Sequence, residues 1–263
     1  MLKYLFGLFI CSFSFSQDIQ IEYEIFFSTE SPIIKTGYLI PYISEQKSNY
    51  YEVFKENVFR DKNDDQNITE TISVGNKNII KRNFTDYKKQ EINSIESSIF
   101  TDSLFMINEK LPNFNWNIEY KDTITLGGYT CKKATTKFRG RSYVAWYAPK
   151  LSMPYGPWKF NGLPGLIFEV YDSTRRYEWS LKSITNKKIN EDKLNLNKAD
   201  YTLSLRKFID YKERMFETKQ KQLLQNIKTR TKRGIYVNNA EIKNLRTGKE
   251  LIYEWEEEEI LKD

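Results

Sequence analysis

Carboxylates are the first residues to consider for chemistry, because the chain contains no histidine. The absence of histidine excludes the common zinc and copper ligand sets and every catalytic arrangement in which histidine is the base. Hydrolysis would then require two acidic side chains facing each other across a cleft. Glu169 and Asp172 form the most suggestive pair, but a spacing of three residues puts them on opposite faces of a regular strand. Asp64 and Asp65 lie in a polar turn.

The rest of the sequence has no pattern typical of a catalytic or cofactor site. It contains no Gly-rich phosphate loop, no cluster of metal ligands and no nucleophile elbow. We therefore predict a protein that is not an enzyme and that binds no cofactor and no metal ion. A hydrolase that uses carboxylates stays as an alternative, which would need a cleft that the sequence does not show.

Four basic residues recur at alternate positions and suggest a contact with anions. Lys133, Lys137, Arg139 and Arg141 occupy odd positions, so a regular strand would place them on one face. Arginine offers a bidentate fork to carboxylate or phosphate groups, which makes Arg139 and Arg141 candidate partner-binding residues. Simple solvation of the strand is the alternative, and a bulge at Gly140 would break the alternation.

Residues 149–165 form the most distinctive connection in the sequence, with four of the seven prolines and three of the eleven glycines. Long ordered connections of this kind are typically functional or held by their own packing. In one interpretation, Trp158, Phe160 and Leu163 close the end of a sheet. In the other, a rigid loop displays Trp158, Lys159 and Phe160 to a partner protein, since interfaces favour such residues.

The same loop carries a motif that resembles a known family. The motif residues are Gly156, Pro157, Trp158, Lys159 and Phe160, then Gly162, Leu163, Pro164, Gly165, Leu166 and Ile167, preceded by the segments 138–141 and 145–147. This block, which spans roughly residues 125–172, closely resembles the GLPGLI family of exported Bacteroidota proteins. The resemblance implies a structural role for Gly156, Pro157 and the residues from Gly162 to Leu166. The family has no demonstrated activity and is often encoded beside outer-membrane TonB-dependent transporters or proteins with a carboxypeptidase-regulatory-like domain, which implies a partner rather than a reaction.

The first 16 residues have the order of a cleavable signal peptide. Lys3 precedes an apolar run from Tyr4 to Phe13, and Ser14 and Ser16 are the small residues before the cleavage point. The run is shorter than the roughly 20 residues that a membrane-spanning helix needs. We expect cleavage after Ser16, a mature chain from Gln17, and a periplasmic location with association with the outer membrane.

The two cysteines are not expected to form a disulfide. Cys11 leaves with the signal peptide, because Ile10 stands where a lipoprotein peptidase requires a small residue; lipidation of Cys11 is the alternative. Cys131 then remains alone, and we expect it to be buried as a small apolar residue. Pairing of Cys131 with another chain is the alternative.

Composition favours a β-rich protein with a mildly basic surface. Aromatic residues make up 15% of the chain, and these residues suit pleated, half-buried surfaces. The net charge of +6 is spread over Lys-rich stretches, which indicates either a solvated surface or attraction to anionic envelope material. Nucleic acid is excluded as a partner by the expected compartment.

Periodicity predicts an antiparallel sheet followed by one helix. Alternation of apolar and polar residues, or short apolar runs between turn residues, predicts strands over 19–25, 35–44, 48–58, 79–86, 99–108, 116–120, 122–126, 129–138, 142–148, 167–171 and 177–184. Tight turns are expected at Gly127 and Gly128, at Gly140 and at Asp172 to Thr174, and a polar turn at 61–66. Apolar residues at helical spacing from Leu203 to Ile227 predict a long amphipathic helix packed on one sheet face.

The predicted fold class is α+β and mainly antiparallel β: a curved sheet or half-barrel with one long C-terminal amphipathic helix. We expect a signal peptide over residues 1–16 and a single domain over 17–263. The predicted function is that of a non-enzymatic periplasmic accessory subunit of an outer-membrane complex such as one built on a TonB-dependent transporter, peripheral to the membrane. The alternative is a carrier that holds a lipid or another apolar ligand in the half-barrel. The acidic run from Glu254 is expected to be solvated.

Overall fold

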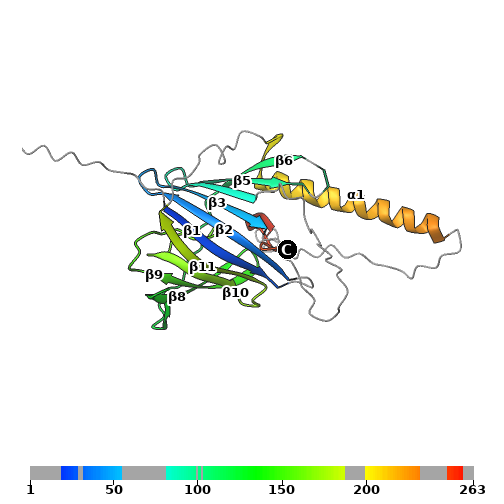
Figure 1. Cartoon of the computed structure of the whole chain (residues 1–263). Helices are drawn as coiled ribbons and strands as arrows, with labels where there is room; N and C mark the ends of the chain where they lie inside the picture. The colour runs from blue at the N-terminus through cyan, green and yellow to red at the C-terminus, as the bar shows by residue number, and fades with distance from the viewer. Residues whose placement is uncertain are drawn as a thin grey trace, which may run out of the picture.

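The computed structural model describes residues 19–28, 32–54, 81–98, 100–101, 103–186, 199–231 and 248–256. The expected signal peptide, Cys11 and the polar turn at 61–66 lie outside these residues. The described part contains one sheet and one long helix, α1 (Figure 1). The strands are β1 (Ile19–Phe27), β2 (Ile33–Tyr42), β3 (Lys47–Phe54), β4 (Lys81–Asp86), β5 (Glu91–Ser97), β6 (Leu104–Lys110), β7 (Thr123–Leu126), β8 (Tyr129–Phe138), β9 (Arg141–Ala148), β10 (Leu166–Asp172), β11 (Tyr177–Asn186) and β12 (Tyr201–Ser204).

All twelve strands belong to one open, curved sheet in the order β12-β6-β5-β4-β3-β2-β1-β11-β10-β9-β8-β7. Two antiparallel meanders, β1 to β6 and β7 to β11, meet where β1 pairs with β11. The last strand, β12, pairs parallel with β6 at the sheet edge. The prediction of a mainly antiparallel curved sheet with one C-terminal helix is therefore confirmed.

The expected turns lie where glycine permits a positive backbone angle. Gly127 and Gly128 have φ of 54° and 82° and join β7 to β8, and Gly140 has a φ of 77° between β8 and β9. The strands β10 and β11 form the hairpin expected after Asp172. Residues 116–120 do not form the predicted strand, because only one bridge, from Asn117 to Thr135, joins them to the sheet.

One face of the sheet carries the main core and is called the inner face below. Ile21, Tyr23 and Ile25 of β1 alternate onto it, as the period of two in the sequence requires. Figure 1 shows α1 starting near β5 and β6 and extending beyond the sheet. Cys131 is fully buried as a free thiol, and burial raises its pKa to about 11.

The helix α1 spans Leu205–Thr231, so the prediction of a long helix is confirmed with a start two residues later. Its first turns supply the buried residues Leu205, Phe208 and Ile209, which pack against Phe105 of β6 and Tyr253. The sheet therefore holds α1 by its N-terminal end. In the part of the chain that the structure describes, no helix is long and apolar enough to cross a membrane.

Candidate functional site

The connection between β9 and β10, residues 149–165, is called the motif loop and lies on the inner face. Trp158 is only 8% exposed and Phe160 only 1%, and Trp158 stacks on Trp179 of β11 with ring centroids 6.0 Å apart. The Asn83 side chain of β4 donates a hydrogen bond to the Trp158 carbonyl at 3.1 Å. The motif loop thus contacts both meanders and forms part of the core.

Two of the motif glycines are required by space and one by backbone angle. A Cβ atom at Gly156 would lie 2.6 Å from Ile167 and 2.9 Å from the Phe160 carbonyl oxygen. A Cβ atom at Gly165 would lie 2.3 Å from the carbonyl oxygen of Ala148. Gly162 has a φ of 86° and open space around it. The motif therefore encodes a compact fold of the loop on the sheet.

Residues 248–256, called the strap below, cross the inner face beside the motif loop (red in Figure 1). The backbone N–H groups of Leu251 and Ile252 donate to the Arg139 carbonyl at 2.9 and 3.3 Å. The Tyr143 hydroxyl donates to the Lys249 carbonyl at 2.9 Å, and burial raises the pKa of Tyr143. The Arg141 guanidinium donates to the Gly248 carbonyl at 2.7 Å. Backbone contacts thus hold the strap along much of its length.

A buried ionic cluster links the strap, the motif loop and β6. The Arg139 guanidinium pairs with Glu250, with Glu109 at 3.0 Å and with Glu254 at 2.9 Å. Lys159 pairs with Glu109 and, at 3.0 Å, with Glu250. Burial lowers the pKa of Arg139, but the neighbouring carboxylates outweigh burial and raise it above its usual range. For Glu250, burial alone would raise the pKa. The charges of Lys159 and Arg139 outweigh burial and lower the pKa to about 2.

A second ionic group lies where the strap meets β3. Lys249 Nζ is 2.7 Å from Glu52 Oε1, and Lys35 Nζ of β2 is 3.3 Å from Glu52 Oε2. Burial raises the pKa of Glu52, but Lys249 and Lys35 lower it to about 2. Burial lowers the pKa of Lys249 to about 8, although Glu52 opposes this shift. The carboxylate is thus ionised at neutral pH between two ammonium groups.

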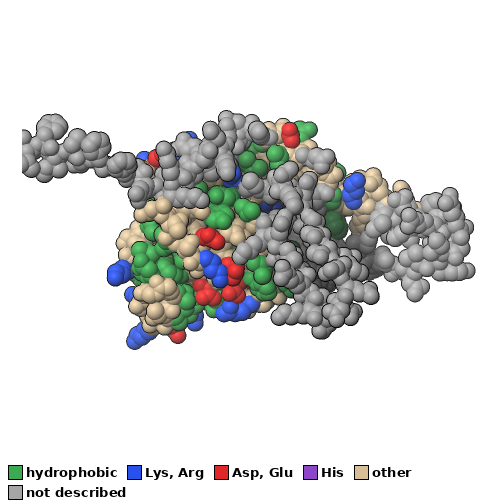
Figure 2. Space-filling model, viewed as in Figure 1, with side chains coloured by type: hydrophobic (Ala, Val, Ile, Leu, Met, Phe, Trp, Pro, Cys, Tyr) green, Lys and Arg blue, Asp and Glu red, His purple; other side chains and the backbone are tan. Residues whose placement is uncertain are grey.

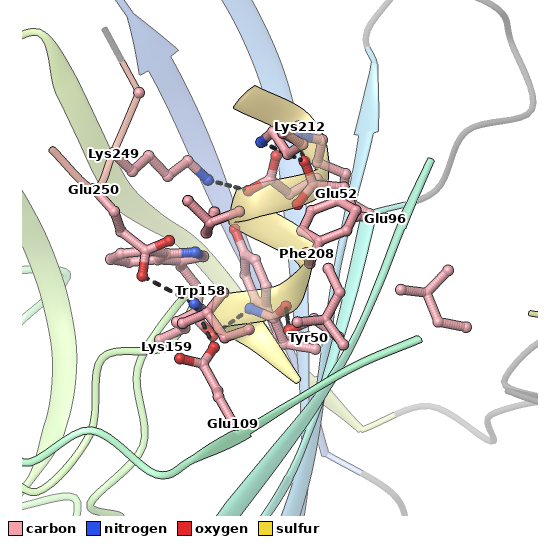
Figure 3. Close-up of a pocket in the computed structure, with 18 of the residues that line it drawn as sticks. Tyr50, Glu52, Glu96, Glu109, Trp158, Lys159, Phe208, Lys212, Lys249 and Glu250 are labelled. Atoms are coloured by element: carbon pink, nitrogen blue, oxygen red, sulfur yellow. Dashed lines mark hydrogen bonds and ion pairs between the residues drawn. The ribbon is translucent and has the colours of Figure 1, made fainter. Parts of the chain in front are cut away.

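The two ionic groups border a cavity of about 300 Å³ between the sheet, the strap and the start of α1 (Figure 3). Figure 3 shows Lys249 pointing at Glu52, and Lys159 lying between Glu109 and Glu250. A third set joins Glu96 of β5 to Lys81, at 3.6 Å, and to Lys212 of α1, at 3.4 Å. Trp158, Tyr50, Phe27, Tyr177 and Phe208 supply aromatic walls.

The charges around the cavity compensate one another. Its four lining carboxylates, Glu52, Glu96, Glu109 and Glu250, each have a basic partner within 4 Å. The basic partners of Glu52 and Glu250 lower the pKa of each to about 2 against the effect of burial, so neither of these two is protonated near neutrality to act as a general acid. No group of three or more metal-ligating side chains occurs among the described residues. The cavity is therefore suited to binding a polar, charged group.

The surface beyond the cavity mixes the two signs of charge. Figure 2 shows acidic and basic side chains next to one another over the sheet. Arg175 pairs with Glu178 at 2.9 Å, and Lys182 of β11 pairs with Glu24 of β1 at 2.8 Å. Glu169 lies on this outer side near Arg175, whereas Asp172 is buried against Arg141 at 3.1 Å. The two carboxylates are thus separated, as the strand period predicts.

The five expected partner-binding residues do not form one exposed surface in the structure. Arg139, with a φ of 45°, lies in the turn before Gly140, so the chain reverses there and Arg141 belongs to the next strand. The prediction of one basic face containing both arginines is wrong for this reason. Trp158, Lys159 and Phe160 are buried, so of the two interpretations of this loop the structure agrees with packing and not with outward display. These five residues instead lie around the strap and the motif loop.

Sequence reasoning missed the acidic partners and the strap. Glu52 follows Tyr50 by two positions on β3, so the strand period alone could have placed a carboxylate on the inner face. Lys249 and Glu250 show no period, because residues 248–253 of the strap form neither helix nor strand. Glu254 was expected in a solvated run, yet it reaches Arg139 while its side chain stays 56% exposed. These ion pairs join segments that are distant in sequence, so only the three-dimensional structure reveals them.

No family model matches the sequence, and no curated protein matches it. Among solved structures, a crystal structure of PNGF-II resembles this chain with a TM-score of 0.50 and 14% sequence identity. That match covers 76% of this chain and 34% of PNGF-II, and a second crystal form gives a TM-score of 0.49, 15% identity and coverage of 76% and 33%. The chain thus spans about a third of the length of PNGF-II. Identity this low shows a similar fold only.

Proposed function

We propose that the protein is a non-enzymatic binding subunit that holds a segment of a partner protein on the inner face of its sheet. The observation that carries this proposal is the strap. Residues 248–256 are held on that face through backbone hydrogen bonds to Arg139 and through ion pairs of Lys249 and Glu250. A surface that binds one peptide segment through its backbone and through a basic and an acidic side chain has the chemistry to bind another.

We further propose the cellular setting that the sequence suggests. The chain is exported to the periplasm with cleavage after Ser16, belongs with the GLPGLI proteins, and works beside an outer-membrane protein such as a TonB-dependent transporter. The intact mass of protein from envelopes tests cleavage: retention of residues before Gln17, or a lipid on Cys11, contradicts it.

Affinity isolation tests the partner proposal. Tagged full-length protein is crosslinked in intact envelopes, solubilised in detergent and analysed by mass spectrometry. We expect one outer-membrane protein to be enriched with the wild type and lost with Glu52→Gln, which removes the carboxylate that holds Lys249. Glu24→Gln is the matched control, because Glu24 forms an exposed pair with Lys182. Recovery of the protein alone, or equal recovery with both variants, contradicts the proposal.

The apolar carrier receives less support from this site. The cavity is lined by four acidic and four basic side chains, and burying an apolar chain against them would remove water from charged groups. Catalysis by carboxylates stays a second alternative, although the lining carboxylates all carry basic partners. Native mass spectrometry of gently purified protein distinguishes the carrier, since co-purified lipid would favour it and a clean protein mass would not.

A further inference from the structure

The strap places one ammonium group among three aromatic rings. Lys249 Nζ lies 5.1 Å from the ring centre of Phe27, 5.4 Å from that of Trp158 and 5.1 Å from that of Trp179. Glu52 completes the surroundings with a contact of 2.7 Å. We call Phe27, Trp158, Trp179 and Glu52 the cage. Aromatic faces and one carboxylate are the groups that recognise an ammonium ion away from bulk water.

The cage is formed without any contribution from the strap. Phe27 belongs to β1, Glu52 to β3, Trp179 to β11 and Trp158 to the motif loop. The rings are fixed by one another, because Phe27 and Trp158 both pack on Trp179, with ring centres 6.3 and 6.0 Å from it. The strap supplies only the ammonium. The sheet and loop therefore form a receptor, and Lys249 occupies it as a ligand would.

The receptor continues beyond the cage with the opposite charge. Glu250, the next residue of the strap, pairs with Arg139 and Lys159, which are contributed by the β8–β9 turn and the motif loop. The inner face thus has an aromatic site with a carboxylate, Glu52, beside a cationic site, and the adjacent residues Lys249 and Glu250 occupy the two. A lysine followed by an acidic residue can place its ammonium in the cage and its carboxylate in the cationic site.

We propose that the cage is a binding site for a lysine ammonium carried by a peptide of a partner protein, with an acidic residue next in sequence, and that Lys249 and Glu250 fill this site until the partner displaces them. The proposal rests on the proposed function and names the chemistry that the partner must present.

The first experiment asks whether the cage recognises an ammonium group. Full-length Lys249→Ala protein is titrated with n-butylammonium, with neutral n-butanol as the matched probe, while tryptophan fluorescence and the melting temperature are followed. We expect saturable binding of n-butylammonium at least about tenfold tighter than that of n-butanol. Lys182→Ala, which loses an exposed lysine, should give no saturable response. Equal binding of the two probes, or none, overturns the proposal.

The second experiment tests the peptide. A fluorescein-labelled peptide with the sequence of residues 248–256 is added to full-length Lys249→Ala protein and followed by anisotropy. We expect binding that weakens about tenfold or more when norleucine replaces the lysine of the peptide. Binding of n-butylammonium without binding of the peptide would overturn the peptide part of the proposal. Peptide binding without an envelope partner would instead count against the proposed cellular function only.

A measurement on the unaltered chain covers the case in which Lys249→Ala does not fold. The amides of Leu251 and Ile252 donate to the Arg139 carbonyl, so their hydrogen exchange reports release of the strap. Excess unlabelled peptide should speed their exchange severalfold, while the norleucine peptide should not. Exchange that is unchanged by either peptide contradicts displacement.

Discussion

Lys249 donates a 2.7 Å hydrogen bond to Glu52 across 197 residues of sequence and so ties the strap to β3. Glu52 is shared with Lys35, and the carboxylate is 4% exposed. A buried carboxylate of this kind is tolerated only while its basic partners stay in place, because without them the charge would have neither a partner nor water around it. The inner face therefore depends on the strap electrostatically as well as through backbone hydrogen bonds.

Arg139→Ala is expected to lower the free energy of unfolding by about 3 to 5 kcal/mol, because it leaves Glu109 and Glu250 buried with less positive charge beside them. Arg175→Ala, in an exposed pair with Glu178, should cost at most about 1 kcal/mol. Urea unfolding of both variants measures the difference. Similar losses for the two would show that the buried cluster contributes no more than a surface pair.

Gly140→Ala should destabilise the protein by about 2 kcal/mol and loosen the strap. The φ of 77° strains any side chain, and a Cβ atom there would lie 3.0 Å from Leu251. Gly128→Ala is the matched control, since its φ of 82° carries the same strain with open space around it and should cost about 1 kcal/mol. Only Gly140→Ala should speed hydrogen exchange at Leu251. Equal exchange rates in both variants would argue against the strap contact.

Gly156→Ala should destabilise the motif loop by about 1 to 3 kcal/mol through crowding alone. Its Cβ atom would meet Ile167 at 2.6 Å and the Phe160 carbonyl at 2.9 Å. Gly162→Ala has open space, so it should show only the backbone strain of about 1 kcal/mol. Thermal unfolding compares the variants, and quenching of tryptophan fluorescence reports access to Trp158. A Gly156→Ala protein as stable as the wild type would contradict the close packing described.

Stability should fall as the pH is lowered from about 4.5 toward 2. The pKa values of Glu52 and Glu250 are both lowered to about 2 in the folded protein. A carboxylate with a lowered folded pKa stabilises the fold above its unfolded pKa and loses that contribution as the pH falls through the folded value. Each group should contribute about 3 kcal/mol.

Urea unfolding between pH 6 and pH 2 measures this loss. Glu52→Gln should flatten the dependence on pH by the contribution of one carboxylate, because glutamine does not titrate. Glu24→Gln should leave the curve unchanged, since that side chain is exposed in its pair with Lys182. A wild-type stability that stays constant down to pH 2 would contradict ionised buried carboxylates.

The fold was largely accessible from the sequence because its signals are local. The alternation in Ile21, Tyr23 and Ile25 and the paired glycines at 127 and 128 each act within a few residues. The strand β5 was missed because Asn93, Ser94 and Ser97 give it a polar composition, although Ile92 is fully buried. Its pairing with β4 and β6 overrides that weak propensity.

The candidate site was only partly accessible because its partners are distant in sequence. The interpretation that Trp158, Phe160 and Leu163 close the core agrees with their burial. The pairing of Glu109 with Arg139 and Lys159 depends on where the motif loop and β6 meet, which no local pattern encodes. The positive φ of Arg139 has the same origin, since a turn residue other than glycine gives little sign of its angle.

The position of the strap in the chain bears on the order of folding. Residues 248–256 follow every strand of the sheet in the chain, so Glu52 and Arg139 gain their full set of partners only when this segment docks on the sheet. A sheet without the docked strap would carry uncompensated charge toward its own interior, which favours an open, unpacked state. Docking of the strap is thus the step that completes the inner face.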